Sequence, residues 1–547
     1  MTLSTDPSAL NHIQRRHHLN RMTTEGVDVL VVGGGVTGVG SALDATTRGL
    51  RVGLVEQRDY ASGTSSRSSK MFHGGLRYLE QYEFGLVREA LRERNLMLNT
   101  LCPHLVTPTS FIYPIEHRVW ERLYVGAGVF LYEILARLAS NPLPWHQHLG
   151  YRRLERLAPA LSAKGGIRYW DAVVDDARHT VTVARTAAAH GAMLASSTRV
   201  VGVDQSGGPI KAVRVVDLEE GRELTIPAGV VVNATGVWTD DVEELAGEHR
   251  RDVQASKGIH FLIPRDRIDA RTGIILRTEV SVLFVIPWRS HWIVGTTDTP
   301  WSLHRAHPAA SRSDIEYLLK WVNTVLRDPI SADDIVGVYA GLRPLLKGES
   351  ETTSKLSREH AVIDRGNGMV TVAGGKYTTY RVMAADVIEA TAPYLGRGLP
   401  SSSTDQVPLV GAAPHNDDRL HGRYGTLREE VLAVGDEYSR VVVEEAPYLL
   451  AELRYAVTHE GALHLDDVLT RRTRLSIETL DRGIDAAGPA ARVMGEVLGW
   501  DGATRAREIA HYEARVRAER DSQSQPDDRT ADAARMGAPD VRTGVSE

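Results

Sequence analysis

The chain has a single cysteine, Cys102, among its 547 residues. One cysteine excludes an intramolecular disulfide and a metal site built from cysteine alone, and we expect no metal centre. Scarce cysteine also fits a protein of the reducing cytoplasm. Cys102 stands beside Pro103, and we interpret it as a small apolar core residue.

Long apolar runs and an excess of one charge are also missing. No run of about 18 apolar residues occurs, which predicts that no helix spans a membrane. The first 25 residues carry Arg15 and Arg16 without an apolar core behind them, so we expect no signal peptide. The formal net charge of −6 provides no basic field, which predicts that nucleic acid is not a partner.

The strongest positive signal lies between residues 27 and 56. An apolar strand pattern runs into Gly33, Gly35 and Gly38, a helical pattern follows, and a second strand pattern ends at Glu56. The three glycines permit a tight turn, a close approach to a pyrophosphate and close packing of helix on strand. Glu56 is placed to accept hydrogen bonds from ribose hydroxyls. The stretch predicts a dinucleotide-binding unit.

Later strand patterns are scattered and more antiparallel, and helical patterns replace them after about residue 400. We therefore expect an α/β fold, in which a Rossmann-like cofactor domain is interleaved with an antiparallel-sheet substrate domain and followed by an all-α domain. The predicted ranges are a mobile extension over 1–25, a cofactor domain over about 26–95, 170–245 and 340–400, a substrate domain over about 96–169 and 246–339, a helical domain over 401–517, and a disordered tail over 518–547.

Three further segments carry polar groups suited to a cofactor rich in oxygen. Ser65, Ser66, Ser68, Ser69 and Lys70 form a hydroxyl-rich loop, and His73, Gly75 and Leu76 follow it. Ala234, Thr235 and Gly236 follow an apolar strand pattern, where small residues let the backbone approach a ligand. Gly375, Lys376, Thr378 and Thr379 follow another and open a helix, which makes a positive site. For each segment, an ordinary surface loop or structural turn is the alternative.

Basic residues cluster in sequence near these turns. They are Arg77, His260, Arg343, Arg358 and Lys376. The planar fork of arginine matches phosphate oxygens, and histidine accepts protons near neutral pH. Each of them alone is more typical of a surface ion pair, and the sequence does not show that they converge in space.

These segments together resemble the FAD-dependent glycerol-3-phosphate dehydrogenases. The most selective matches are His73-Gly74-Gly75-Leu76-Arg77-Tyr78 and Gly341-Leu342-Arg343-Pro344. Matches also occur at the Gly33 turn, in 170–178, 233–236, 257–260, 295–298 and 374–381, and in the helical remainder around 466–475. The matches span roughly residues 27–394 and extend into the helical part, whereas the two terminal segments are extra.

The resemblance implies oxidation of sn-glycerol 3-phosphate to dihydroxyacetone phosphate, with non-covalent FAD as hydride acceptor and a membrane quinone as the next acceptor. It places His260, Arg343 and Lys376 at the chemistry, and Arg77, Tyr78, His260, Arg343, Arg358 and Lys376 at the substrate. The identity of the catalytic base is not settled: His260 is the titrating candidate, whereas Arg343 could hold the developing alkoxide electrostatically. The residues expected at FAD are Gly33, Gly35, Gly38, Glu56, Ser65, Ser66, Ser68, Ser69, Lys70, His73, Gly75, Leu76, Ala234, Thr235, Gly236, Arg343, Gly375, Lys376, Thr378 and Thr379.

Alternatives remain for the reaction and the location. A glycerol-3-phosphate oxidase would pass electrons to oxygen, and an amine or amino-acid oxidase would need a carboxylate site; a non-catalytic FAD scaffold is a third reading.

The apolar segment 123–138 has aromatic and basic flanks, typical of a helix in a bilayer interface or of a core helix. We expect a cytoplasmic protein with peripheral contact to the membrane, and a homodimer stays open.

Overall fold

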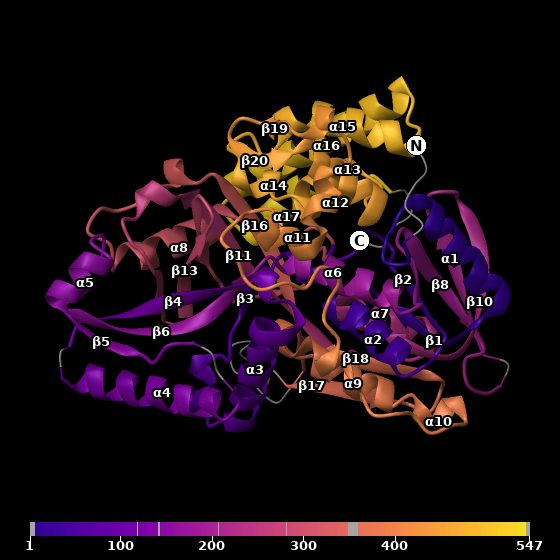
Figure 1. Cartoon of the computed structure of the whole chain (residues 1–547), viewed down its shortest axis with the longest axis horizontal. Helices are drawn as coiled ribbons and strands as arrows, with labels where there is room; N and C mark the ends of the chain where they lie inside the picture. Colours follow the sequence, from indigo (N-terminus) through magenta and orange to yellow (C-terminus); the bar gives the residue numbers. More distant parts are fainter. Residues whose placement is uncertain are drawn as a thin grey trace.

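The computed structural model describes residues 6–117, 119–140, 143–205, 207–279, 282–347 and 359–542. Two β-sheets lie side by side, and the C-terminal helices, orange to yellow in Figure 1, lie over the region where the two sheets meet. Arg358 lies outside the described residues, so the structure does not place it.

The first sheet has the strand order β17-β18-β10-β1-β2-β7. Its bounds are β1 (Val27–Val32), β2 (Val52–Val55), β7 (Met193–Ala195), β10 (Arg222–Asn233), β17 (His360–Asp364) and β18 (Met369–Gly374). All neighbours pair in parallel except β17 with β18, while β8 (Thr198–Asp204) and β9 (Ala212–Asp217) extend β10 as antiparallel strands. The parallel strands bring their carboxyl ends to one edge of the sheet.

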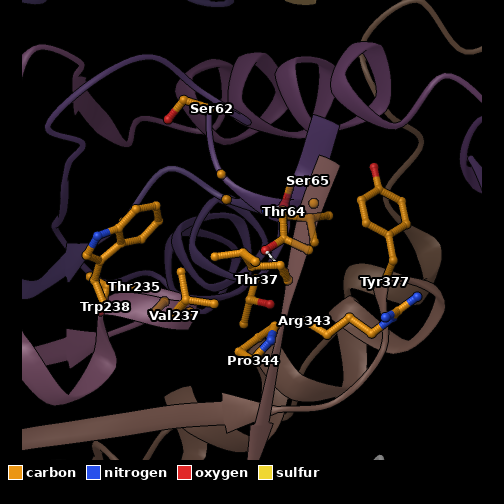
Figure 2. Close-up of a pocket in the computed structure, with 18 of the residues that line it drawn as sticks. Thr37, Ser62, Thr64, Ser65, Thr235, Val237, Trp238, Arg343, Pro344 and Tyr377 are labelled. Carbon is orange, nitrogen blue, oxygen red and sulfur yellow. Dashed lines mark hydrogen bonds between the residues drawn. The ribbon is translucent and has the colours of Figure 1, made fainter. Parts of the chain in front are cut away.

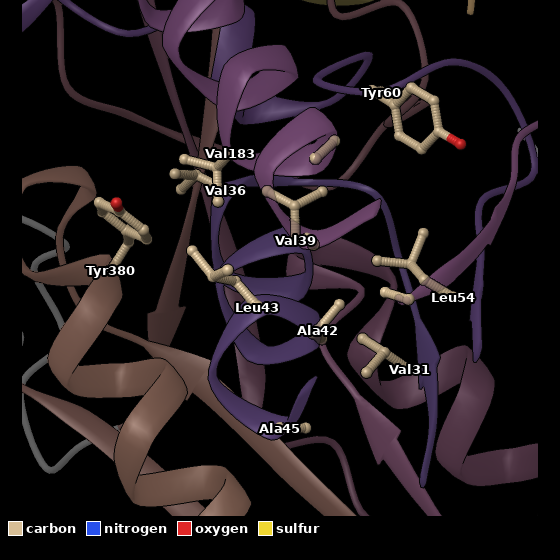
Figure 3. Close-up of a cluster of buried hydrophobic side chains, with 14 of the residues drawn as sticks. Val31, Val36, Val39, Ala42, Leu43, Ala45, Leu54, Tyr60, Val183 and Tyr380 are labelled. Atoms are coloured by element: carbon tan, nitrogen blue, oxygen red, sulfur yellow. The ribbon is translucent and has the colours of Figure 1, made fainter. Parts of the chain in front are cut away.

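Helix α2 (Val36–Thr47) packs on this sheet because its apolar residues recur at helical spacing. Val36, Val39 and Leu43 lie in the same buried cluster as Val31 and Leu54 of the strands. Figure 3 shows Tyr380 of α9 (Tyr380–Glu389) and Val183 of α6 (Asp176–Ala189) beside α2. This core fixes the end of α2 that meets the glycine turn.

The second sheet has the order β15-β11-β14-β13-β12-β4-β6-β3, with β16 beside β11 and β5 beside β6. Its bounds are β3 (Met71–Phe72), β4 (Val106–Ile115), β5 (Gln147–Gly150), β6 (Gly165–Val174), β11 (Val253–Pro264), β12 (Gly273–Arg277), β13 (Val282–Trp288), β14 (His291–Gly295), β15 (Thr299–Trp301) and β16 (Gly337–Leu346). Among the described strands of this second sheet, only β12 and β4 pair in parallel.

Alternate residues of the second sheet face two different cores. Phe261 and Ile263 join a cluster with α8 (Arg312–Asn323), whereas Leu262 joins a cluster with α4 (Trp120–Arg137). This period of two is what a strand buried on both faces requires. The sheet is therefore buried on both faces, with α8 against one face and α4 against the other.

The predicted fold is confirmed, with shifted boundaries. Strands of the two sheets alternate along the chain, which is the expected interleaving of two domains. β16 belongs to the second sheet, as do β3 and the end of β6, although the predicted ranges placed residues 71–72, 170–174 and 340–346 in the cofactor domain. The backbone of these segments pairs with β11, β6 and β4, and this pairing places them in the second sheet.

The C-terminal part is mainly helical, with α13 (Leu450–His459), α15 (Ile484–Leu498) and α16 (Gly502–Ser524) around one core. α13 begins only at Leu450, because a hairpin of β19 (Val441–Val443) and β20 (Ala446–Leu449) precedes it. The β-branched run 441–443 favours strand over helix.

The prediction of a mobile N-terminal extension was wrong for its described part. Residues 12–25 form α1 (His12–Glu25), capped by the Asn11 side chain. Arg15, Leu19 and Met22 are buried, and Arg15 donates to Asp217 at 2.6 Å. The helix is held by a narrow buried stripe and a buried ion pair, which its low overall hydropathy concealed.

The prediction of a disordered C-terminal tail was likewise wrong as far as residue 542. α16 continues to Ser524, and α17 (Asp528–Arg535) follows. Some of the charges that suggested disorder are paired inside the protein: Arg542 donates to Asp467 at 2.8 Å, and Arg58 donates to Asp540 at 3.0 Å. Composition alone cannot distinguish solvated charges from paired ones.

Candidate active site

A cavity of about 600 Å³ lies where the two sheets meet. The ends of β1, β2, β10 and β18 contribute one part of its lining, and β11 and β16 contribute the other. In Figure 2, Trp238 lies on one side of this space, and Arg343 and Tyr377 lie on the opposite side. The fold thus brings both sets of predicted residues to one place.

The glycine turn after β1 has the geometry that its sequence predicts. Gly33 has φ +111°, a region that favours glycine, and Gly35 caps the N-terminus of α2. A Cβ on Gly38 would lie 1.9 Å from the Gly33 carbonyl oxygen. Gly38 therefore allows α2 to meet the turn closely and aims the N-terminus of α2 at the cavity.

Glu56 stands at the end of β2 and lines the cavity. Its carboxylate accepts from the Gly34 N–H at 2.6 Å and from the Arg58 N–H at 2.8 Å. Burial raises the pKa of Glu56 above its ordinary value. The two backbone donors fix the carboxylate and leave it further lone pairs for a ligand hydroxyl.

The hydroxyl-rich loop closes over the start of α2. It includes the short 3-10 helix η1 (Thr64–Ser66), and the Ser65 hydroxyl accepts from the Val36 N–H at 2.9 Å. Thr64 donates to the Leu342 carbonyl of β16 at 2.5 Å. The loop therefore connects the glycine turn to the second sheet.

His260, on β11, is buried beside the cavity. Its Nε2 lies 2.9 Å from the Ser69 hydroxyl, and its ring stacks on Tyr339 of β16. Burial, and then the charges of Arg343 and Lys70, hold the pKa of His260 well below its ordinary value. His260 is therefore neutral near pH 7 and able to accept a proton.

Arg343 and Lys376 supply positive charge to the same cavity. The Arg343 Nη2 donates to Thr296 Oγ1 and to the Thr297 carbonyl, both at 3.1 Å. Lys376 Nζ lies 3.7 Å from the centre of the Tyr78 ring, a cation–π contact that holds the ammonium in place. These two cations and His260 form a site suited to an anionic substrate with a dissociable hydroxyl.

Most of the predicted site residues line this cavity. They are Gly33, Gly35, Glu56, Ser65, Ser68, Ser69, His73, Tyr78, Ala234, Thr235, Gly236, His260, Arg343, Gly375, Lys376 and Thr378. Gly38, Ser66, Lys70, Gly75, Leu76, Arg77 and Thr379 are described but do not line it. Gly38 acts through the packing of α2, and Thr378 bonds back to His73 at 3.3 Å.

Lys70 is the clearest difference from the prediction. It is fully buried, and its Nζ donates to Asp176 at 2.9 Å and to the Ser66 carbonyl at 3.0 Å. Arg474 of the C-terminal part binds the same Asp176. Lys70 therefore holds the hydroxyl-rich loop against two other segments and makes no contact with the cavity in the described structure.

Sequence reasoning missed several contributors. Thr37, Thr64 and Trp238 line the cavity, and Tyr339 supports His260 from the next strand. Thr37 lies inside the glycine motif, and Trp238 follows Gly236 by two residues, so their positions were available as signals. Tyr339 had no local signal, because only the antiparallel register of β11 and β16 places it opposite His260.

The lining fits a dinucleotide cofactor joined to a redox site. The turn at Gly33 offers backbone N–H groups to a pyrophosphate, and Glu56 stands where a ribose would lie. The Nδ1 of His260 is buried with no hydrogen-bond partner in the described part of the chain, which leaves it available to a bound molecule. Within the described ranges, no cluster of three or more His, Cys, Asp or Glu residues could hold a metal ion.

Comparison with known proteins agrees with this geometry. A family described as FAD dependent oxidoreductase matches residues 28–381, and one described as the C-terminal domain of alpha-glycerophosphate oxidase matches residues 373–505. The glycerol-3-phosphate dehydrogenase of Mycobacterium leprae is 53% identical, over 99% of this chain and 96% of that protein. The mitochondrial glycerol-3-phosphate dehydrogenase of Homo sapiens is 34% identical, over 88% and 72%.

A solved structure is similar along most of the chain. The glycerol-3-phosphate dehydrogenase from Bacillus halodurans, complexed with FAD, superposes with a TM-score of 0.74 and 27% identity, covering 93% of this chain and 98% of that one. The L-alpha-glycerophosphate oxidase from Mycoplasma pneumoniae shares the fold at 17% identity and a TM-score of 0.51. On sequence, cofactor turn and fold together, the chain belongs to the family of FAD-dependent glycerol-3-phosphate dehydrogenases.

Proposed function

We propose that this protein oxidises sn-glycerol 3-phosphate to dihydroxyacetone phosphate, using non-covalently bound FAD and a quinone as the next acceptor. The observation that carries the proposal is a single cavity that combines the dinucleotide turn at Gly33 with His260, Arg343 and Lys376. The family of the chain and its 53% identity to a glycerol-3-phosphate dehydrogenase support the same reaction.

The cofactor is held by the first sheet. Gly33, Gly35 and the N-terminus of α2 take the pyrophosphate, Glu56 takes the ribose, and the loop at Ser65 closes over them. Lys376 lines the same cavity, and its positive charge would favour electron density on a flavin ring held there. Bound FAD supplies a two-electron acceptor for the hydride that leaves C2 of the substrate.

The substrate phosphate is held by cations that line the cavity. Arg343 has its guanidinium fixed by Thr296 and Thr297, so its donors are already oriented toward a phosphate. Lys376 and Tyr78 line the same cavity. Arg77, next to Tyr78, and Arg358, outside the described residues, complete the proposed set.

The proton of the C2 hydroxyl goes to His260. Its lowered pKa keeps the imidazole neutral, and Tyr339 and Ser69 hold the ring in place. Arg343 then stabilises negative charge developing on the C2 oxygen. This assignment gives His260 the role of general base and Arg343 an electrostatic role.

An apolar face on α4 supports the proposal that a quinone is the next electron acceptor. Leu123, Tyr124, Phe130 and Leu138 are exposed on and just after this helix, which lies along the lower edge of Figure 1. α4 packs on η2 (Leu76–Gln81), the segment that carries Tyr78 into the cavity. An apolar face on a helix that packs against a cavity-lining segment suits peripheral contact with the cytoplasmic side of a membrane.

No helix in the described ranges is long and apolar enough to cross a bilayer. Contact through α4 would therefore be at the membrane surface, with the aromatic and leucine side chains entering the interface. A homodimer stays a prediction without a supporting observation.

The test follows the visible spectrum of the purified holoenzyme under nitrogen. Glycerol 3-phosphate should bleach the flavin absorbance, whereas glycerol and amino acids should not. The reduced enzyme should be reoxidised rapidly by a soluble quinone and slowly by air. Fast peroxide formation in air would show that oxygen, not a quinone, is the electron acceptor. Bleaching by an amino acid would indicate an amino-acid oxidase. A flavin that no substrate reduces would contradict the proposal.

A further inference from the structure

A second, much smaller cavity lies next to the active-site cavity, and Arg67 lines both. Its volume is about 50 Å³, and it is bordered by the hydroxyl-rich loop, β16 and the C-terminal helices. We call it the arginine cavity, defined by Arg67, Arg474, Arg515, Arg535, Glu519 and Ser476. None of these residues belongs to the predicted active site.

Positive charge exceeds negative charge around the arginine cavity. Glu519 is the carboxylate that lines this cavity, and it forms ion pairs with Arg515 at 2.9 Å and with Arg535 at 3.6 Å. Arg67 donates to the Ala306 carbonyl at 2.9 Å, which is a neutral partner. Arg515 has a further partner in Asp466, and Arg474 is paired with Asp175 and Asp176. Arg67 and Arg535 thus both lie near Glu519, which Arg515 binds at the shorter distance.

Polar groups of the lining are also left without hydrogen bonds. Arg535 is 3% exposed and Ser476 is 4% exposed. In the described structure, Arg535 Nη1 and Ser476 Oγ have no hydrogen-bond partner. A buried donor without a partner is costly, and it is more costly when it carries charge. Two such groups bordering one small cavity indicate a ligand that accepts hydrogen bonds.

We propose that the arginine cavity binds one small inorganic oxyanion of the phosphate or sulfate class. The planar fork of arginine matches the oxygens of a tetrahedral oxyanion, and the serine hydroxyl adds a neutral donor. The volume has room for one such ion and none for an organic ester of the size that the main cavity admits.

The electrostatics of the arginines agree with this ligand. Burial and the neighbouring Arg515, Arg471 and Arg535 lower the pKa of Arg67 to about 9. Burial lowers the pKa of Arg535 to about 10. An anion between them would offset both effects, since opposite charge favours the protonated guanidinium.

The bound ion would join three parts of the chain. Arg67 follows η1 of the cofactor domain, Arg515 lies on α16, and Arg535 lies on α17. Arg67 borders both cavities, and Tyr339, which stacks on His260, also borders the arginine cavity. Binding should therefore secure the C-terminal helices against the wall of the active site.

The experiment measures thermal unfolding of the holoenzyme against inorganic phosphate, with potassium chloride at equal ionic strength as reference. Phosphate should raise the unfolding midpoint along a saturable curve, because a ligand of the folded state stabilises it. Arg535→Gln should weaken the apparent affinity at least about tenfold, as expected for loss of a charged donor. Arg529→Gln, an exposed arginine of the same helix, should leave the curve unchanged.

Ser476→Ala keeps the test decisive if Arg535→Gln fails to fold. Its hydroxyl has no protein partner, so the midpoint without phosphate should not fall, while phosphate should bind about tenfold more weakly. Phosphate bound at the active site instead would stabilise both variants as it does the wild type. The proposal would be overturned if the wild type, Arg535→Gln and Ser476→Ala gave equal phosphate curves. It would also be overturned if chloride raised the midpoint as much as phosphate, or if phosphate had no effect.

Discussion

His260 and Tyr339 stack face to face, with ring centroids 4.8 Å apart and ring planes inclined by 10°. Tyr339 is itself fixed, because its hydroxyl donates to the Ser68 carbonyl at 3.0 Å. The imidazole is thus held between a clamped ring and the Ser69 hydroxyl. Such a side chain is oriented before substrate arrives, which is what a general base requires.

His260→Asn should lower kcat by about 10²–10⁴-fold, the usual contribution of general base catalysis. FAD content should stay at the wild-type level, because the glycine turn lies on the other sheet. Steady-state kinetics and the flavin spectrum of the same preparation test this. An unchanged kcat would show that His260 is not the general base. It would favour a mechanism in which Arg343 stabilises the substrate alkoxide.

The pH profile of kcat/KM tests the same residue independently. The pKa of His260 is held well below 6.5, so the imidazole should remain the neutral, active form throughout the neutral range. The acid limb should therefore lie below pH 6.5 and should disappear in His260→Asn. A limb centred above pH 6.5 would show that another group titrates.

Arg343→Lys should raise KM for glycerol 3-phosphate about tenfold or more, because an ammonium cannot reproduce the bidentate fork. The residue also loses its donors to Thr296 and Thr297, which orient it now. Arg271→Lys, at an exposed position of the same domain, serves as the matched control. Equal kinetics of the two variants would remove Arg343 from the phosphate site.

Gly38→Ala should yield protein without FAD. The added Cβ would lie 1.9 Å from the Gly33 carbonyl, so α2 or the turn must shift. Gly488→Ala, on α15, meets nothing within 4 Å and should keep its flavin. The ratio of flavin to protein absorbance decides between them, and a fully loaded Gly38→Ala enzyme would contradict the role of the turn.

Stability should fall at alkaline pH because of His464. This imidazole lies between Glu219 and Glu508, at 3.1 and 3.0 Å, and its pKa is raised from 6.5 to about 9. A raised pKa adds stability that is complete below about pH 6.5 and is lost as the pH rises through about 9. The unfolding midpoint should decline across this window, and His464→Gln should flatten that decline. An identical decline in the variant would assign it to other groups.

The α4 face should mediate binding to lipid. Leu123→Glu should reduce co-sedimentation with anionic liposomes, since a charge in the interface opposes insertion. Leu123 is 70% exposed, and Leu480, on the C-terminal part, is 71% exposed. Leu480→Glu is therefore a matched control that should bind as the wild type does. Wild-type protein that stays in the supernatant at low and high salt would contradict membrane contact.

Local patterns were sufficient for the cofactor unit. The Gly33 turn, Glu56 and the apolar strands on either side lie within thirty residues, so short-range geometry determines how they meet. The terminal segments show the opposite case. α1 and α17 have low hydropathy, and partners far away in sequence decide whether their charges are solvated or buried.

The sequence by itself determined the dinucleotide turn, the interleaving of two sheets, and the kinds of residue available for catalysis. Only the tertiary structure decided which of these residues share a cavity: it placed His260 and Arg343 beside Lys376, and it paired Lys70 with Asp176 instead. The physical reason is that strand register and buried ion pairs join residues far apart in the sequence, such as His260 with Tyr339 and Lys70 with Asp176. No local periodicity records those distances.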